Sequence, residues 1–433
     1  MSKLLSINSF RVLIFRAFSV AIIARIVQVC MAVILARTLD PVGYGLFTFA
    51  LGVAVICGTI GGLGWPTTIV RFFPYYYDRH EKLRLKALML VALGVSLTGP
   101  AILSVGLVTA TQLIEMPEDI RQGLLIAAIM AVPIGLRQFT RQKLAACGRS
   151  PLGLFLDEFL SPAGVVIFGV WLSSASQAAV VYSLFGIAGF AVGELISRRA
   201  LIDLKDNGGP PVSKNNLKEW LWVSLPLTVG LMSRALMNRV DSVMLAPLSN
   251  LEEVGYYAAA FRITYLITFP QVVVSLVLSP KFSKAFSAKL YNDLISTLRF
   301  GLIISLLSVS IFCLLILLFG SQIISFVFGE QFSPSYYPLI ILTISQSISA
   351  VIIPMNAFLT VSGDHNLFGL ITLIGIVVTV LLNLWLIPLY GAVGAAISAM
   401  IVGVILLFLS VISVRNRMKF CKRNWKSDNV QSK

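Results

Sequence analysis

Arginine side chains inside apolar stretches are the residues of this chain whose position points to chemistry. Arg25, Arg234 and Arg262 each interrupt an apolar run long enough to form a helix. A charge near the centre of a lipid bilayer costs at least about 2.5–3.5 kcal/mol on insertion scales, so it usually has a partner or a substrate there. The guanidinium group stays charged and presents a planar set of N–H donors, which suits bidentate binding of phosphate. We predict that these three arginines bind an anionic head group.

Buried ion pairs are the alternative explanation for the same arginines, because a carboxylate on a neighbouring helix would hold the helices together. Arg234 or Arg239 would then pair with Asp241, and the other arginines with carboxylates of the first half of the chain, namely Asp157, Glu158 or Glu194. Arg239 lies two residues before Asp241, so the two side chains do not share a helix face. We expect no direct pair between them.

Two carboxylic acids in apolar runs, Asp241 and Glu194, are candidates for coupling to an ion gradient. A carboxyl group in a medium of low dielectric constant can exchange a proton or hold a cation. For Asp241, pairing with an arginine of a neighbouring helix is the other hypothesis. The sequence leaves both open.

The composition explains why these charges are significant. Only 12% of the 433 residues are charged, 57% are hydrophobic and the mean hydropathy is +0.89. Soluble domains carry about 25% charged residues, so this composition indicates a membrane protein. Twelve apolar runs are long enough to span a bilayer; they lie near 16–39, 44–64, 87–110, 121–142, 152–172, 177–197, 220–246, 253–279, 296–319, 336–358, 367–388 and 392–414.

The two halves of the chain begin alike, which indicates an internal duplication. Val42-Gly43-Tyr44 follows the helix of Arg25, and Val254-Gly255-Tyr256 follows the helix of Arg234. Such repeats are common in transporters. We predict an all-α membrane fold of two six-helix bundles around a central V-shaped cavity, organised as an N-terminal lobe 1–200, a cytoplasmic linker 201–218, a C-terminal lobe 219–414 and a basic tail 415–433.

The net charge of +15 follows from membrane topology. Most of the lysines and arginines fall in alternate loops and in the two termini, whereas Asp40, Glu115, Glu118 and Glu330 lie in the other loops. Basic residues concentrate on the cytoplasmic side of membrane proteins. We predict that both termini are cytoplasmic and that the chain has no nucleic-acid partner. Arg137 is expected near a cytoplasmic helix end, reaching toward the head groups, and Lys143 in a cytoplasmic loop.

No motif for metal, cofactor or nucleotide binding is present. His80 and His365 have no metal-spaced partner, and the five cysteines show no paired spacing. Loops of roughly 20 residues are too short for a folded ATPase domain. We therefore predict no cofactor, no metal and no enzymatic activity.

Four segments resemble the polysaccharide-transport family, the lipid-linked oligosaccharide flippases of the multidrug/oligosaccharidyl-lipid/polysaccharide (MOP) superfamily. They are 35–45 (LARTLDPVGYG), 64–74 (GWPTTIVRFFP), 254–262 (VGYYAAAFR) and 382–391 (LNLWLIPLYG). The resemblance implies alternating access and a substrate of undecaprenyl-pyrophosphate-linked oligosaccharide, moved across a bacterial inner membrane for O-antigen, capsule or exopolysaccharide synthesis. It implies membrane lipid and other polysaccharide-assembly proteins as partners, and Arg25, Arg234 and Arg262 as ligands of the pyrophosphate.

Other functions fit the residues less well. A cation-coupled multidrug exporter of the same superfamily would favour carboxylates and aromatic residues for its cationic substrates, whereas the deep charges here are chiefly arginines. A membrane polysaccharide polymerase or ligase would need a large extracytoplasmic loop. A scaffold without transport would leave the deep arginines without a role.

Overall fold

The structure is a computed structural model that describes residues 7–202, 213–362 and 365–431. Helices make up nearly all of these residues. They are α1 (Ile7–Gly61), α2 (Trp65–Asp78), α3 (Lys82–Leu113), α4 (Glu118–Ala146), α5 (Ser150–Glu158), α6 (Leu160–Phe168), η2 (Gly169–Trp171), α7 (Ala175–Ile202), α8 (Lys214–Leu248), α9 (Leu251–Thr264), η3 (Tyr265–Thr268), α10 (Phe269–Ser287), α11 (Tyr291–Phe328), η4 (Glu330–Ser335), α12 (Tyr336–Val361) and α13 (His365–Gln431).

Each of the twelve predicted spans lies on helix. Within the described residues, nine helical stretches are long and apolar enough to cross a membrane. Two of them, Phe18–Gly61 and Gly369–Lys422, contain a non-helical residue and so hold two predicted spans each. The span predicted near 253–279 is built from α9, η3 and α10. The prediction of an all-α integral membrane fold is confirmed.

The two bends arise from local chemistry. Asp40 adopts a left-handed conformation (φ 60°) before Pro41, and its side chain accepts a hydrogen bond of 2.8 Å from the amide of Gly43. Asp40 therefore caps the second half of α1. In α13, Gly391 has φ 55°, and the backbone amide of Ala392 donates to Glu253 Oε2 over 2.7 Å. A carboxylate at a helix start is favourable because the free N–H groups there carry partial positive charge.

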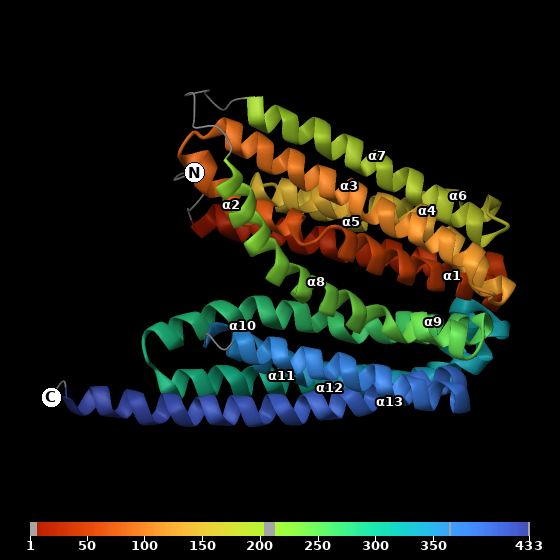
Figure 1. Cartoon of the computed structure of the whole chain (residues 1–433). Helices are drawn as coiled ribbons and strands as arrows, with labels where there is room; N and C mark the ends of the chain where they lie inside the picture. The colour runs from red at the N-terminus through yellow and green to blue at the C-terminus, as the bar shows by residue number, and fades with distance from the viewer. Residues whose placement is uncertain (1–6, 203–212, 363–364, 432–433) are drawn as a thin grey trace. The chain divides into compact units, whose positions relative to one another are not determined.

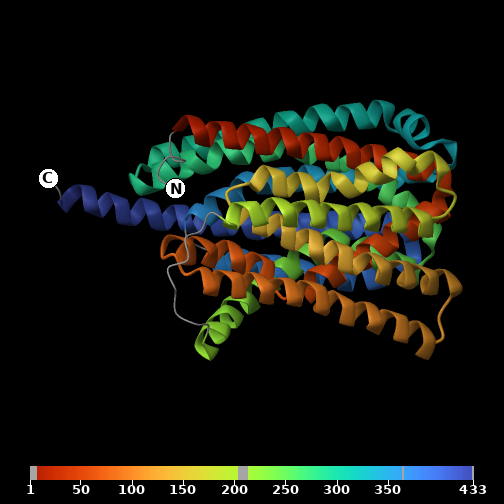
Figure 2. The ribbon, with the colours of Figure 1, turned by 90° about the horizontal axis from the view of Figure 1, so that it is seen from above.

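The helices form two compact units, Met1–Arg239 (unit 1) and Val240–Lys433 (unit 2). In unit 1, α4 packs against α1, α2, α3, α5 and α7. In unit 2, α12 packs against α9, α10, α11 and α13. Figures 1 and 2 show α3, α4 and α7 running alongside one another in both views. α4 holds the fourth predicted span and α12 the tenth, so corresponding helices are central to the two units, as a duplication predicts.

Helix α8 contributes to both units, because the boundary falls between Arg239 and Val240. Residues 203–212 of the predicted linker lie outside the described residues. The predicted lobe limits 1–200 and 219–414 are not tested by this division and stay a prediction.

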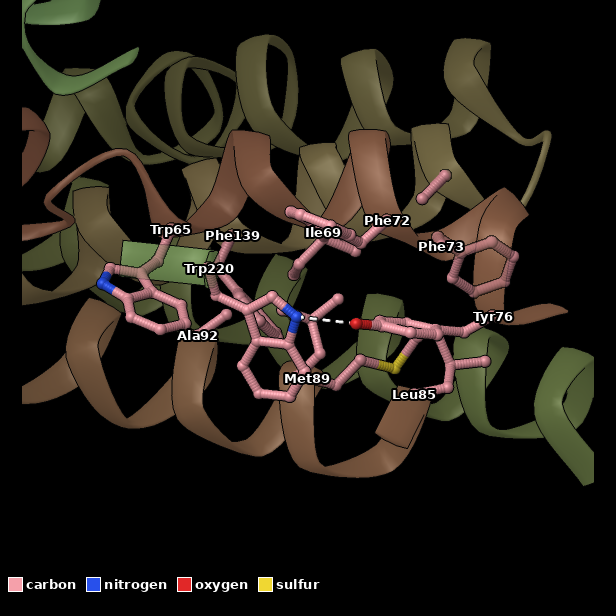
Figure 3. Close-up of a cluster of buried hydrophobic side chains, with 12 residues drawn as sticks. Trp65, Ile69, Phe72, Phe73, Tyr76, Leu85, Met89, Ala92, Phe139 and Trp220 are labelled. Atoms are coloured by element: carbon pink, nitrogen blue, oxygen red, sulfur yellow. Dashed lines mark hydrogen bonds between the residues drawn. The ribbon is translucent and has the colours of Figure 1, made fainter. Parts of the chain in front are cut away.

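An aromatic cluster attaches the beginning of α8 to the rest of unit 1 (Figure 3). The fully buried Trp220 packs edge-on against Trp65 and Tyr76 of α2. Gly64, at the start of α2, has φ 66°, and a Cβ there would lie 2.4 Å from the carbonyl oxygen of Ser224. The segment 64–74 therefore supplies side chains for the core, and its first residue, a glycine, allows α8 to approach α2 closely.

Candidate functional site

Five charged side chains from three helices form a continuous network in unit 1. Arg141 on α4 contacts both carboxylates of α5, with Nη1 3.1 Å from Asp157 Oδ2 and 3.0 Å from Glu158 Oε1. At one end of the network, Arg25 Nη2 lies 3.6 Å from Glu158 Oε2. At the other end, Arg137 Nε lies 3.7 Å from Asp157 Oδ1. Three guanidinium groups face two carboxylates, so the network carries an excess of positive charge.

A proline explains why the carboxylates lie at a break in the fifth span. The carbonyl of Glu158 would normally accept from the amide four residues later, but that residue is Pro162, which has no N–H. The helix is interrupted at Phe159, between α5 and α6. Gln28 Nε2 on α1 donates to the carbonyl oxygen of Glu158 over 3.2 Å, and Gln28 Oε1 accepts from Arg25 Nη1 over 2.9 Å. Gln28 thus connects α1 to the break.

Arg137 and Lys143 are buried, which corrects their sequence-based placement near head groups and in a loop. The guanidinium of Arg137 lies 4.9 Å from the centre of the Tyr182 ring. Lys143 Nζ lies 2.7 Å from Glu194 Oε2 on α7, and Arg198 Nε lies 3.5 Å from Glu194 Oε1. The physical reason is that α4 is the central helix of unit 1, so its last turns are surrounded by partners.

A second polar group lies in unit 2 around Asp241, near the end of α8. Asp241 Oδ2 accepts from the Tyr257 hydroxyl and Oδ1 from Asn383 Nδ2, both over 2.8 Å. Asn383 is fully buried, and its Oδ1 has no hydrogen-bond partner in the described part of the chain. A buried carbonyl oxygen without a donor costs free energy, so this oxygen favours a cation, a proton donor or a water beside Asp241.

The remaining predicted residues are placed separately. Arg234 is exposed on α8 within unit 1, and Arg262 is half-buried in the last turn of α9 in unit 2. Arg239 is half-buried, and it is the last residue of unit 1. Of the three predicted phosphate ligands, only Arg25 belongs to the charged network of α1, α4 and α5.

Sequence reasoning missed Gln28, Tyr257 and Asn383. Each is a polar residue in an apolar run and was visible as such, but nothing local indicates its partner. Asn383 lies in the segment 382–391, whose resemblance to the family does not indicate a contact with Asp241. Among the described residues there is no group of three or more His, Cys, Asp or Glu side chains suited to a metal ion.

A match to a family sequence profile shows to which family the chain belongs. The profile of the polysaccharide biosynthesis proteins matches residues 14–286, and the MatE profile matches 226–385. The chain belongs to the polysaccharide biosynthesis protein family. The predicted membership of the MOP superfamily is thereby confirmed.

Known relatives agree with this family. The chain is 31% identical over 146 residues to a probable low-salt glycan biosynthesis flippase, Agl15, of Haloferax volcanii; the match covers 34% of this chain and 31% of the relative. An inward-facing multidrug resistance MATE family transporter of the MOP superfamily shares the fold, with a TM-score of 0.74, 15% identity and coverage of 92% of this chain and 96% of that one. The lipid II flippase MurJ has a TM-score of 0.70 and 15% identity, over 94% of this chain and 90% of MurJ.

Proposed function

We propose that this member of the polysaccharide biosynthesis protein family moves undecaprenyl-pyrophosphate-linked oligosaccharide across a bacterial inner membrane by alternating access. In this proposal both termini are cytoplasmic, and the oligosaccharide units serve O-antigen, capsule or exopolysaccharide synthesis. The observation that carries the proposal is the charged network of unit 1, in which Arg25 and Arg141 are partly exposed and positive charge exceeds negative charge. An anionic lipid substrate would balance it.

Arg25, Arg234 and Arg262 are the proposed ligands of the pyrophosphate. Arginine binds phosphate oxygens in pairs and keeps its charge in apolar surroundings. The side chain of Arg25 is 35% exposed, Arg234 is exposed and Arg262 is half-buried, so each is within reach of a ligand. Two names are consistent with a glycan-lipid substrate: the curated relative is named a probable glycan biosynthesis flippase, and the structural neighbour MurJ is named a lipid II flippase.

Asp241 is the proposed coupling residue, with a proton or a monovalent cation as the driving ion. The Oδ1 atom of Asn383, which has no hydrogen-bond partner among the described residues and whose side chain contacts the Asp241 carboxylate, supports this choice. Glu194 is held between Lys143 and Arg198, so an additional cation has less reason to bind there. We therefore assign a structural pairing role to Glu194.

The experiment is deletion of the gene in its host, with surface glycan and cytoplasmic-side lipid-linked oligosaccharide measured together. Complementation uses the wild type, Arg25→Ala, Arg234→Ala and, as a matched control, Arg121→Ala, which removes an exposed arginine from a pair with Glu118 on α4. The proposal expects surface glycan to be lost and lipid-linked units to accumulate, with rescue by the wild type and by Arg121→Ala only.

Two other outcomes separate the function from the site. Rescue by Arg25→Ala and Arg234→Ala at equal expression would keep the flippase and remove the arginine assignment. Normal surface glycan in the deletion strain, with no second flippase present, would contradict the proposal and favour a multidrug exporter, the function of the MATE transporter that shares the fold.

A further inference from the structure

The two carboxylate oxygens of Glu158 contact different arginines, at different distances. Arg141 Nη1 lies 3.0 Å from Oε1, whereas Arg25 Nη2 lies 3.6 Å from Oε2. If Arg25 turned away, Glu158 would keep its shorter contact with Arg141. Release of Arg25 therefore leaves no carboxylate unpaired, and the penalty for an uncompensated buried charge does not arise.

The network is buried at one end and open at the other. The side chain of Arg137 is 8% exposed, whereas those of Arg25 and Arg141 are 35% and 41% exposed. An anion can therefore reach the network at Arg25 and Arg141, the two arginines that hold Glu158. The carboxylate of Glu158 occupies the place beside Arg25 that an incoming phosphate oxygen would need.

Gln28 keeps Glu158 beside Arg25. Its amide nitrogen donates to the main-chain carbonyl left free by Pro162, and its amide oxygen accepts from Arg25. The backbone of the break is thus fixed to α1 independently of the Arg25–Glu158 contact. Arg25 can change partners while Glu158 stays in position to take it back.

We propose that Glu158 is a positioning residue that competes with the substrate for Arg25. Without substrate, Glu158 neutralises and orients Arg25; a diphosphate displaces the carboxylate because it offers more charge and more acceptor oxygens. Departure of the diphosphate restores the Arg25–Glu158 pair, so the competition weakens binding and favours release. This inference rests on the proposed function, since it takes a lipid diphosphate as the ligand.

The test is the affinity of the purified full-length protein in detergent for farnesyl diphosphate, measured by calorimetry. Glu158→Gln keeps the shape of the side chain and removes its charge. We expect it to bind the probe more tightly, by about fivefold, as about 1 kcal/mol of a partly exposed ion pair predicts. Arg25→Ala should lose most of the binding. Glu118→Gln is the matched control, because it removes an exposed carboxylate of α4 that pairs with Arg121 and lies outside the charged network; it should change the affinity less than twofold, within the scatter of independent sites.

A second variant allows the proposal to be tested if Glu158→Gln does not fold. Glu158→Asp keeps the charge but shortens the side chain, so the carboxylate lies farther from Arg25 and binding should tighten by a smaller factor. A tighter complex is a result that simple structural damage does not produce. If the Glu158 variants bind farnesyl diphosphate and the wild type does not, this result would also support the competition between Glu158 and the probe.

The outcomes also separate the inference from the proposed function. If the wild type binds farnesyl diphosphate and neither Glu158 variant binds it more tightly, the competition is overturned while the flippase stands. If neither the wild type nor any Glu158 variant binds it, both the inference and the diphosphate site of the proposed function fall.

Discussion

Trp220 Nε1 donates a hydrogen bond of 2.9 Å to the hydroxyl oxygen of Tyr76, within the buried aromatic cluster of unit 1. Trp220 lies near the start of α8 and Tyr76 in α2, 144 residues apart in the chain. A buried indole N–H needs an acceptor, and the tyrosine provides it without a charge. This bond fixes where α8 begins on unit 1 (Figure 3).

Tyr76→Phe is expected to lower the free energy of unfolding by about 1–3 kcal/mol, because the N–H of Trp220 is left buried without an acceptor. The melting temperature in detergent, followed by near-ultraviolet circular dichroism, measures the effect. Tyr77→Phe is the control, since the Tyr77 hydroxyl has no hydrogen-bond partner in the described structure and only its ring stacks, on Phe73. Equal melting temperatures for both variants would show that the bond contributes little.

Lys143→Met is expected to destabilise unit 1 by up to about 3 kcal/mol, because among the described residues it leaves Glu194 with the exposed Arg198 as its remaining ion-pair partner. The double variant Lys143→Met/Glu194→Leu removes both charges and should recover most of the loss. Melting temperatures of the wild type, both single variants and the double variant form the complete cycle. A double variant less stable than either single variant would contradict the pairing role given to Glu194.

Gly391→Ala is expected to reduce the yield of folded protein and its melting temperature, by about 1–3 kcal/mol in free energy of unfolding. The backbone of Gly391 is left-handed, and a Cβ there would lie 2.7 Å from Glu253 Oε2, the acceptor for the Ala392 amide. Gly106→Ala in α3 is the matched control, because a Cβ there meets no atom within 4 Å. It should be neutral or slightly stabilising, since alanine favours helix. A tolerated Gly391→Ala would mean that the bend does not depend on glycine.

Asp241→Asn is expected to lower surface glycan to the level of the deletion strain while the protein is still made and inserted. The amide keeps the size of the side chain but cannot take up a proton or neutralise a cation, so coupling to an ion gradient is lost. Surface glycan in cells, with and without an uncoupler of the proton gradient, measures the effect. Asp119→Asn at the exposed start of α4 is the control. Wild-type levels of surface glycan in the Asp241→Asn strain, both with and without the uncoupler, would contradict the coupling role of Asp241.

Much of the fold could be predicted because the signals for it are local. A bilayer-length apolar run predicts a span whatever it packs against, so all twelve predicted spans lie on helix. Pro41 after Asp40 and Gly391 mark the two bends in the sequence, because both residue types restrict or permit particular backbone conformations. The arginines in apolar runs were also visible as unusual without any structure.

Which polar and charged side chains contact one another was decided only by the tertiary structure. Gln28 and Glu158 are 130 residues apart, and Asn383 and Asp241 are 142 apart, so no local pattern joins them. The same holds for Arg137 and Lys143, whose burial depends on α4 being surrounded by other helices. A sequence records where charges and breaks occur along one helix, because helix formation depends on neighbours in the chain. Which of those charges meet depends on how helices pack, and that is settled by all of their side chains together.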